Sequence, residues 1–273
     1  MKKIGILFLG LISALSFSQN TRFVYQVSMK TDSTAAPKIE NAYLDISTEK
    51  SIFYGEKRMK RDSTIRQAME TRNFNFDRNS MEQFRTAITY SIEKNHATKT
   101  ISYKDRIARD QYWYDEDRTF NWKILPETVK IGEYETQKAE TTFAGRKWFA
   151  WFTQDLPFID GPYKFSGLPG LIVKVEDEKG DYSFDLKETK KIAELPNFES
   201  RFGNNIKVKR SEFLKQQEKF NKDPMSFFQN QGGGFAMRMG GNQNPQNEAE
   251  RRKMMEERLK EEAKANNNPL EKN

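Results

Sequence analysis

Two-residue alternation of apolar and polar side chains is the feature that most constrains the fold of this chain. Between residues 21 and 209 it recurs in short segments rich in β-branched and aromatic residues, which is typical of strands with one buried face. Residues 86–93 put Ile88, Tyr90 and Ile92 on one face. The polar turn Lys94-Asn95-His96 then leads into a second alternating segment, 98–104, so a hairpin is predicted.

The remaining alternating segments predict a mainly β fold. Strands are expected near residues 23–27 and 44–46, and at 111–114, 119–125, 134–143, 146–153, 171–176 and 182–188. Strands do not alternate regularly with long amphipathic helices, which argues against a doubly wound parallel sheet. We therefore expect an antiparallel meander forming a curved sheet or half-barrel, with an ordinary β-sandwich as the alternative. Ser211 is expected to cap a C-terminal helix that runs to about Asn221.

The composition divides the chain into three parts. Residues 1–18 have a basic start, an apolar run and a small-residue exit, and are predicted to be a signal peptide cleaved near Ser18. Residues 19–228 form the predicted β-rich domain. Residues 229–273 are rich in Gly, Asn, Gln and charged side chains, which predicts a flexible tail, disordered or partly helical, with a possible helix at 248–265.

The predicted leader and the residue counts limit the location and the partners. An exported chain without cysteine cannot carry a lipid on an N-terminal cysteine, so a non-lipidated protein of the periplasm or cell envelope is expected. The formal net charge is +7, but basic and acidic residues are interspersed, which argues against a nucleic-acid partner. Peripheral contact with a membrane or with glycans stays open.

One segment carries a family resemblance. Residues 167–172 read Gly-Leu-Pro-Gly-Leu-Ile, and the chain here resembles the GLPGLI family of Bacteroidetes envelope proteins. The similarity extends to Gly145-Arg146, Ala150-Trp151-Phe152, Gly161-Pro162, Asp177, Gly180 and the ending Asn268-Pro269-Leu270-Glu271. The resemblance implies an exported protein of unknown function, with proposed links to outer-membrane receptor or transporter components. It supplies no catalytic residues.

The motif itself has two interpretations. Gly167 and Gly170 allow positive φ or close backbone approach, while Pro169 restricts its own φ and biases Leu168 toward an extended conformation. The motif is therefore expected either to be a structural turn, with Leu171 and Ile172 starting a strand, or to form the rim of a cavity. The side chains expected to accompany a cavity as a ligand or partner surface are Arg146, Trp148, Trp151, Asp155, Asp160 and Tyr163.

Candidate chemistry is sparse. No cysteine nucleophile exists, and His96 is the only histidine and lies in a predicted turn, which disfavours a Ser-His-Asp triad. The leading hypothesis is a non-enzymatic protein, without a predicted cofactor or metal, that binds a ligand or partner. The alternatives are a periplasmic hydrolase that uses Asp155 or Asp160 with Arg146, and a Cu(I)-handling protein that uses tail methionines such as Met237 and Met239.

Overall fold

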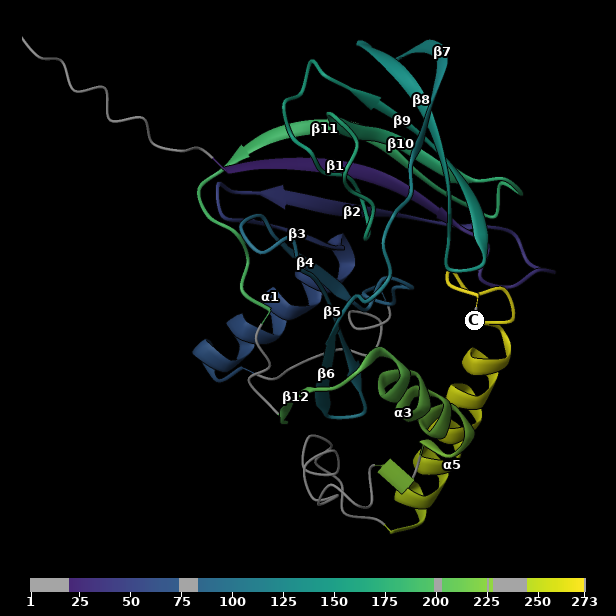
Figure 1. The fold of residues 1–273 in the computed structure, drawn as a ribbon. Coiled ribbons are helices and arrows are strands. Elements are labelled where there is room, and N and C mark those ends of the chain that lie inside the picture. The colour runs from purple at the N-terminus through teal and green to yellow at the C-terminus, as the bar shows by residue number, and fades with distance from the viewer. Residues whose placement is uncertain (1–19, 74–82, 199–202, 225, 228–244, 273) are drawn as a thin grey trace, which may run out of the picture.

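Twelve strands form one sheet in the computed structural model, which describes residues 20–73, 83–198, 203–224, 226–227 and 245–272 (Figure 1). The strands are β1 Asn20–Met29, β2 Lys38–Ile46, β3 Lys50–Gly55, β4 Ser91–Asn95, β5 Ile101–Ile107, β6 Asp110–Asp115, β7 Lys123–Ile131, β8 Tyr134–Phe143, β9 Arg146–Thr153, β10 Leu171–Asp177, β11 Tyr182–Ile192 and β12 Asn205–Lys207. Their order is β12-β6-β5-β4-β3-β2-β1-β11-β10-β9-β8-β7. Two meanders, β1 to β6 and β7 to β11, are therefore joined through β1 and β11.

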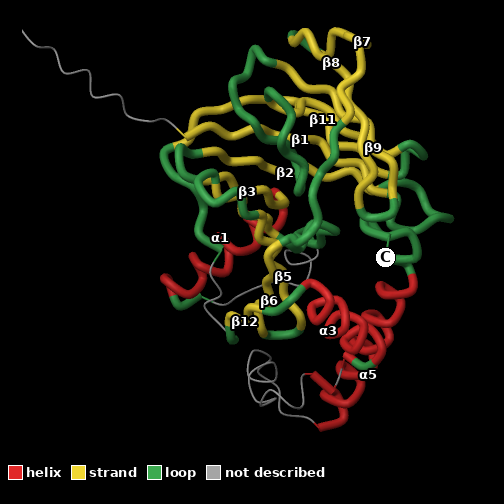
Figure 2. The backbone as a smooth tube through the Cα atoms, viewed as in Figure 1, coloured by secondary structure: helices red, strands yellow, loops and turns green. Residues whose placement is uncertain are grey.

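The predicted curved, mainly antiparallel sheet is confirmed. Every neighbouring pair is antiparallel except β12 and β6, and β12 and β7 are the two edges of an unclosed sheet. Phe53 on β3 and Phe184 on β11 have ring centroids 6.1 Å apart. These strands are three steps apart, or about 14 Å in a flat sheet. The sheet therefore curves around this pair, and Figure 2 shows the strands changing direction along it.

The predicted hairpin at the only histidine is also confirmed. β4 pairs with β5, and His96 follows β4 in the turn between them. The strand that precedes the turn begins later than predicted, at Ser91, and it continues through Lys94 and Asn95, which were expected in the turn.

In the described parts of the chain, the helices that lie outside the sheet are α1 Glu56–Thr71, α3 Arg210–Lys222 and α5 Pro245–Lys264. Helix α1 packs on β2 and β3 and has no continuous apolar face, so the sequence pattern did not indicate it. Ion pairs one turn apart, Glu56 with Lys60 and Arg58 with Asp62, support it instead. Helix α3 is confirmed, but its N-cap is Lys209 rather than Ser211, which lies within the first turn.

The long β9–β10 connection, residues 154–170, packs on the inner face of the sheet. Its residues Tyr163, Phe165 and Leu168 are buried in the same core as Trp148 of β9 and Phe184 of β11. The Phe165 ring makes edge contacts with both of the latter, at 4.8 and 6.2 Å between centroids. The concavity of the sheet is thus largely filled by the chain's own connection, which contains the first four residues of the Gly-Leu-Pro-Gly-Leu-Ile motif.

The last described residues bind to the sheet through what we call the C-terminal clasp: Arg146, Asp177 and Asp181 with residues 268–272. The buried guanidinium of Arg146 donates to Leu270 O, Asp177, Asp181, the Asn268 side chain and Pro269 O. Lys272 N donates to Ala144 O, and a Cβ on Gly145 would lie 2.7 Å from the Lys272 side chain. Gly145 therefore gives the terminal segment room to pass.

The clasp binds residues 268–272, the end of the segment predicted to be a tail. Asn268 N donates to Thr31 O and its side chain to Lys30 O, while Tyr182 donates to Asn268 O. The helix expected at 248–265 extends over Pro245–Lys264. The Gly-rich part of the predicted tail and the predicted signal peptide lie outside the described residues. None of the helices in the described parts of the chain has the length and apolar character needed to cross a membrane.

Candidate ligand-binding pocket

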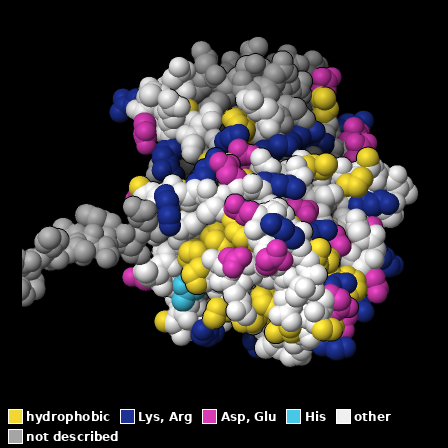
Figure 3. Space-filling model, turned by 90° about the horizontal axis from the view of Figure 1, so that it is seen from above, with side chains coloured by type: hydrophobic (Ala, Val, Ile, Leu, Met, Phe, Trp, Pro, Cys, Tyr) yellow, Lys and Arg dark blue, Asp and Glu magenta, His cyan; other side chains and the backbone are white. Residues whose placement is uncertain are grey.

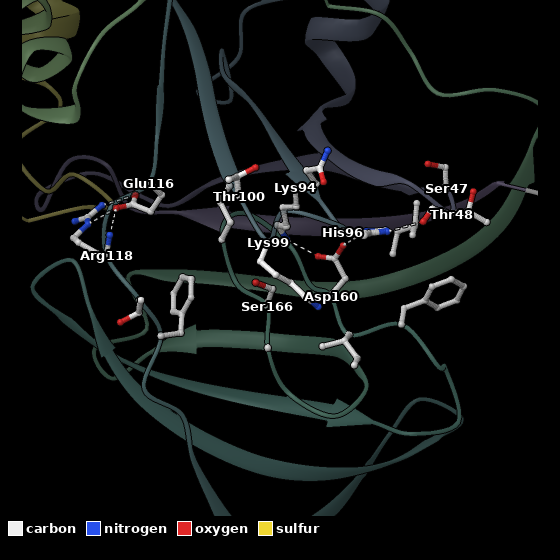
Figure 4. A pocket seen from close by; sticks show the side chains of 18 of the residues that line it. Ser47, Thr48, Lys94, His96, Lys99, Thr100, Glu116, Arg118, Asp160 and Ser166 are labelled. Carbon is white, nitrogen blue, oxygen red and sulfur yellow. Dashed lines mark hydrogen bonds and ion pairs between the residues drawn. The ribbon is translucent and has the colours of Figure 1, made fainter.

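Four connections of the sheet meet around a cavity of about 710 Å³ (Figure 4). They are the β2–β3 turn, the β4–β5 turn, the segment after β6 and the β9–β10 connection. A cavity of this size lies within the range of pockets that hold small organic ligands. Strand ends contribute to the wall as well, because Ile46 belongs to β2, Lys94 to β4 and Ile101 to β5.

Lys94, His96 and Asp160 form a charged cluster on the wall. Lys94 Nζ lies 2.6 Å from an oxygen of Asp160 and also donates to Gly161 O and Phe165 O. The other oxygen of Asp160 lies 3.9 Å from His96 Nε2. Lys94 and Asp160 are buried, whereas the His96 side chain is 36% exposed. All three residues line the pocket, and the histidine is the most exposed of them.

The protonation of this cluster follows from burial and pairing. Burial lowers the pKa of Lys94 and opposes ionisation of Asp160, but the Lys94 ammonium and His96 outweigh burial and hold the Asp160 pKa below its ordinary value. The Asp160 carboxylate, helped by the Thr48 carbonyl that faces His96 Nδ1, raises the pKa of His96 above its ordinary value. The wall thus carries a histidine that favours the cationic form.

A second charged network lies at the other end of the pocket. Arg118 donates two hydrogen bonds to the carboxylate of Glu116 and one, at 2.7 Å, to Glu271 of the clasp. Lys164, which is fully buried, donates to Glu116, Glu271 and Tyr114. The pocket wall and the C-terminal clasp are therefore joined through Glu271.

The carboxylates of this second network are held ionised. Although burial acts in the opposite direction, Arg118 and Lys164 lower the pKa of Glu116 to about 2. The same two cations lower the pKa of Glu271 against its burial. Such pairs are costly to break, because removing one partner leaves an uncompensated buried charge.

The rest of the wall is mostly apolar. Phe120, Phe158 and Ile159 line it, and the Ile159 side chain is 66% exposed. Figure 3 shows the molecular surface from above. The histidine (cyan) lies near hydrophobic side chains (yellow) and acidic side chains (magenta). The pocket therefore presents apolar area next to paired charges.

The Gly-Leu-Pro-Gly-Leu-Ile motif acts as a turn and also reaches the pocket. Gly170 has φ +150°, and a Cβ there would lie 2.1 Å from Thr153 O, so the turn is packed against the end of β9. Gly167 has φ +92°, lines the pocket, and a Cβ there would meet no atom within 4 Å. Leu168, Leu171 and Ile172 are buried. Gly170 therefore packs against backbone atoms, whereas Gly167 faces open space.

The residues predicted to form one ligand surface are dispersed. Only Asp160 lines the pocket. Arg146 is enclosed in the clasp, and Trp148 is 1% exposed with its indole N–H bound to Phe143 O, so its ring offers no surface to a ligand. Asp155 is exposed in the connection.

The other two aromatic residues of the predicted set, Tyr163 and Trp151, also contact other side chains of the protein. Tyr163 is buried and donates to Glu271. Trp151 is half-buried between the ammonium groups of Lys138 and Lys174, at 5.6 and 4.9 Å from its ring centroid. The predicted hydrolase grouping is not assembled, because the Arg146 contacts go to the clasp and the Asp160 contacts go to Lys94 and His96.

Sequence reasoning missed the pairing of Lys94 with Asp160 and the role of Arg118. One signal for Lys94 was present: the inward face of Ile88, Tyr90 and Ile92 continues by two residues to position 94. A lysine on a buried face requires a buried acid. Its partner lies 66 residues away in a loop, and no local pattern indicates it.

A family model described as "Protein of unknown function (Porph_ging)" matches residues 141–174. The match covers the end of β8, β9, the whole β9–β10 connection with its motif, and the start of β10. It therefore spans the segment that fills the concavity and forms one wall of the pocket. A comparison with curated proteins gave no match.

Among solved structures, PNGF-II is similar in fold. In its P21 crystal form the TM-score is 0.52 at 18% identity, covering 72% of this chain and 33% of PNGF-II. In its C2 form the values are 0.53 and 17%, covering 72% and 32%. This chain thus spans about a third of PNGF-II. The LolA superfamily protein NE2245 from Nitrosomonas europaea is a weaker match, with a TM-score of 0.28 at 10% identity over 66% of this chain and 88% of that protein.

Proposed function

We propose that this chain is a non-enzymatic exported envelope protein of the GLPGLI type that binds a small ligand in the pocket between its loops. One observation carries the proposal: a cavity of about 710 Å³ in which the Lys94–Asp160 and Arg118–Glu116 ion pairs lie beside apolar side chains. Paired charges fix the shape of a pocket, and the apolar area gives a ligand a reason to leave water.

The proposed location and partners follow from the sequence. Residues 1–18 support export to the periplasm or cell envelope, and the motif supports a place among accessories of outer-membrane transport. Cell fractionation tests this part: the chain is expected in the envelope or periplasmic fraction, shortened by about 18 residues, and deletion of residues 2–18 should retain it in the cytoplasm. Equal distributions of the two forms would contradict export.

Fewer observations support the two alternatives, a hydrolase and a Cu(I)-handling protein. The hydrolase proposal requires Arg146 beside Asp155 or Asp160, and these groups are engaged elsewhere or exposed. The copper proposal depends on Met237 and Met239, which lie outside the described residues, while Met254 and Met255 are exposed on α5. It stays a prediction that direct Cu(I) titration of the chain with and without residues 228–244 can test.

Ligand binding is tested with N-phenyl-1-naphthylamine, an uncharged probe whose fluorescence rises in apolar surroundings. We expect saturable binding of one probe per chain. The substitution Thr100→Trp, at an exposed position of the pocket wall, should weaken binding about tenfold by filling space. The matched control is Thr142→Trp, at an exposed position of β8 outside the wall, which should leave binding unchanged.

A second pocket variant keeps the test valid if Thr100→Trp does not fold. Ile159→Asp puts a charge on the apolar wall and should also weaken binding, whereas Ile39→Asp, equally exposed but outside the pocket, should not. Thermal melting verifies that each variant is folded. Absence of saturable binding to the wild type, or equal effects of pocket and control variants, would overturn the proposal.

A further inference from the structure

The charges on the pocket wall do not balance once the ion pairs are removed. Lys94 is paired with Asp160, and Arg118 with Glu116. The remaining wall acid, Asp117, is paired with Arg210 at 3.3 Å. Lys99 is left without an acidic partner, and His96 shares Asp160 with Lys94; both residues belong to the β4–β5 turn.

Lys99 is the more exposed of the two. Its residue has φ +58° in the turn, and within the described chain no acidic side chain forms an ion pair with its ammonium group. Figure 4 shows the Lys99 side chain among those that line the pocket, on the side where His96 and Asp160 lie. An ammonium ion without a carboxylate partner at the mouth of a cavity attracts an anion.

His96 adds to this positive end. Its ring is 36% exposed, and its Nδ1 faces the Thr48 carbonyl at 3.2 Å, which a protonated nitrogen satisfies. Its Nε2 faces Asp160 at 3.9 Å, longer than a hydrogen bond. A ligand oxygen near this turn therefore meets an exposed ammonium group and an imidazole edge together.

The rest of the wall has the opposite character. Phe120, Pro157, Phe158 and Ile159 come from the two longer connections, and Ile46 and Ile101 border the turns. These side chains carry no polar group that requires a partner. They fit an apolar body, and the burial of a few methylene groups against them contributes appreciably to affinity.

We infer that the ligand is an anionic amphiphile, whose acidic head lies at Lys99 and His96 and whose apolar body lies against the aromatic wall. This rests on the proposed function, because it requires that the pocket bind a ligand. A carboxylate, a phosphate monoester or a sulfonate shares the required chemistry: a compact anion that accepts charge-assisted hydrogen bonds.

The test uses two probes that differ by one group. N-phenyl-1-naphthylamine is uncharged, and 8-anilinonaphthalene-1-sulfonate is the same skeleton with a sulfonate. We expect the sulfonate to bind about tenfold more tightly, the size of one charge-assisted hydrogen bond. Lys99→Met should remove most of this preference without weakening the uncharged probe, and Lys99→Arg should retain it.

Displacement of the sulfonate probe identifies the head group. Dodecanoate and dodecyl phosphate are compared with dodecanol, which has no charge, and with inorganic phosphate, which has no apolar body. Displacement by either charged chain at concentrations at least tenfold below those of dodecanol and inorganic phosphate supports the inference, and the stronger of the two names the head. Equal displacement by dodecanol and dodecanoate would overturn it.

The outcomes separate the two proposals. If neither probe binds the pocket, the proposed function fails. If the uncharged probe binds and is blocked by Thr100→Trp, but the sulfonate is no tighter or Lys99→Met leaves the preference intact, only the anionic head is refuted. His96→Gln gives an independent reading, since it should reduce the preference for the sulfonate while Lys99 is intact.

Discussion

The C-terminal clasp and the pocket cluster both contain a buried cation held by a carboxylate, but they differ in what surrounds the pair. Arg146 donates to five acceptors and is 4% exposed, so the clasp leaves its guanidinium no capacity for a further partner. The Lys94–Asp160 pair instead lines the pocket, beside a partly exposed histidine. The same chemistry therefore fastens chain segments in one place and shapes a ligand surface in the other.

The difference distinguishes two residues that sequence reasoning placed at one surface. Arg146 and Asp160 both flank the motif segment, and both were expected at one ligand surface. The structure shows that satisfaction of hydrogen bonds, rather than residue type, separates a structural charge from one available for binding. The following predictions test this separation, from the largest expected effect to the smallest.

Arg146→Met should destabilise the fold by about 3–5 kcal/mol, because it leaves the Asp177 carboxylate buried without its partner. Urea denaturation measures the loss. The control is Lys123→Met, whose ion pair with Glu140 is exposed on the lysine side and should contribute less than about 1 kcal/mol. Equal losses in the two variants would contradict the distinction.

The two motif glycines should respond differently to alanine. Gly170→Ala should cost about 3 kcal/mol or more, since a Cβ overlaps Thr153 O and the backbone must move. Gly167→Ala should cost about 1–2 kcal/mol, because its φ is unfavourable but the space is open. Thermal melting of both variants measures the two losses of stability. A smaller loss for Gly170→Ala than for Gly167→Ala would show that the turn is not packed as described.

Glu271→Gln should cost about 1.5–3 kcal/mol, because Lys164 and Arg118 each lose a charged partner. The pH dependence has a definite sign. Glu116 and Glu271 have pKa values lowered by folding, to about 2 for Glu116, so their contribution is complete above about pH 4.5 and is lost as the pH falls toward 2.

Stability measured by urea denaturation between pH 5 and pH 3 tests this dependence. The wild type should lose stability more steeply than Glu271→Gln over this range. Parallel curves would show that the network does not supply the acid sensitivity. Asp32→Asn serves as the control for a carboxylate outside the network, because its pKa is also lowered but by hydrogen bonds from Thr34 and Asn267 rather than by a buried cation.

His96→Gln should change stability least, by less than about 1 kcal/mol, because the ring is more than a third exposed. Folding raises the pKa of His96, so its contribution is present below pH 6.5 and disappears as the pH rises through the folded-state pKa. The difference between wild type and variant should therefore be larger at pH 5.5 than at pH 8.5. A larger difference at pH 8.5 would reverse the assigned sign.

Local pattern was sufficient for most of the sheet. The segments 134–143 and 146–153 were predicted with the bounds that β8 and β9 have, since their alternation and the Ala144-Gly145 turn are local signals. Helix α1 was missed because it is held by ion pairs and by packing on β2 and β3 rather than by an apolar stripe.

The pocket depended on information that no local pattern contains. It is assembled from four connections, and its ion pairs join residues 66 positions apart or, at Arg118 and Glu271, 153 apart. The clasp shows the same limit. The ending Asn268-Pro269-Leu270-Glu271 is part of the family resemblance, but its low apolar content predicted a solvated segment. In the structure it is held by backbone and side-chain hydrogen bonds to residues that are distant in sequence.

The clasp also sets the order in which this chain can complete its fold. Asn268 donates hydrogen bonds to Lys30 O and Thr31 O, and 238 residues separate it from Lys30. The segment that follows β1 therefore cannot make these contacts until residue 268 has been synthesised. Closing so long a loop is entropically unfavourable, and contacts of this separation form late. A ribosome that delivers the chain from its N-terminus therefore releases residues 147–267 after Arg146 and before its partner Asn268, and Lys164 likewise precedes its partner Glu271 by more than a hundred residues.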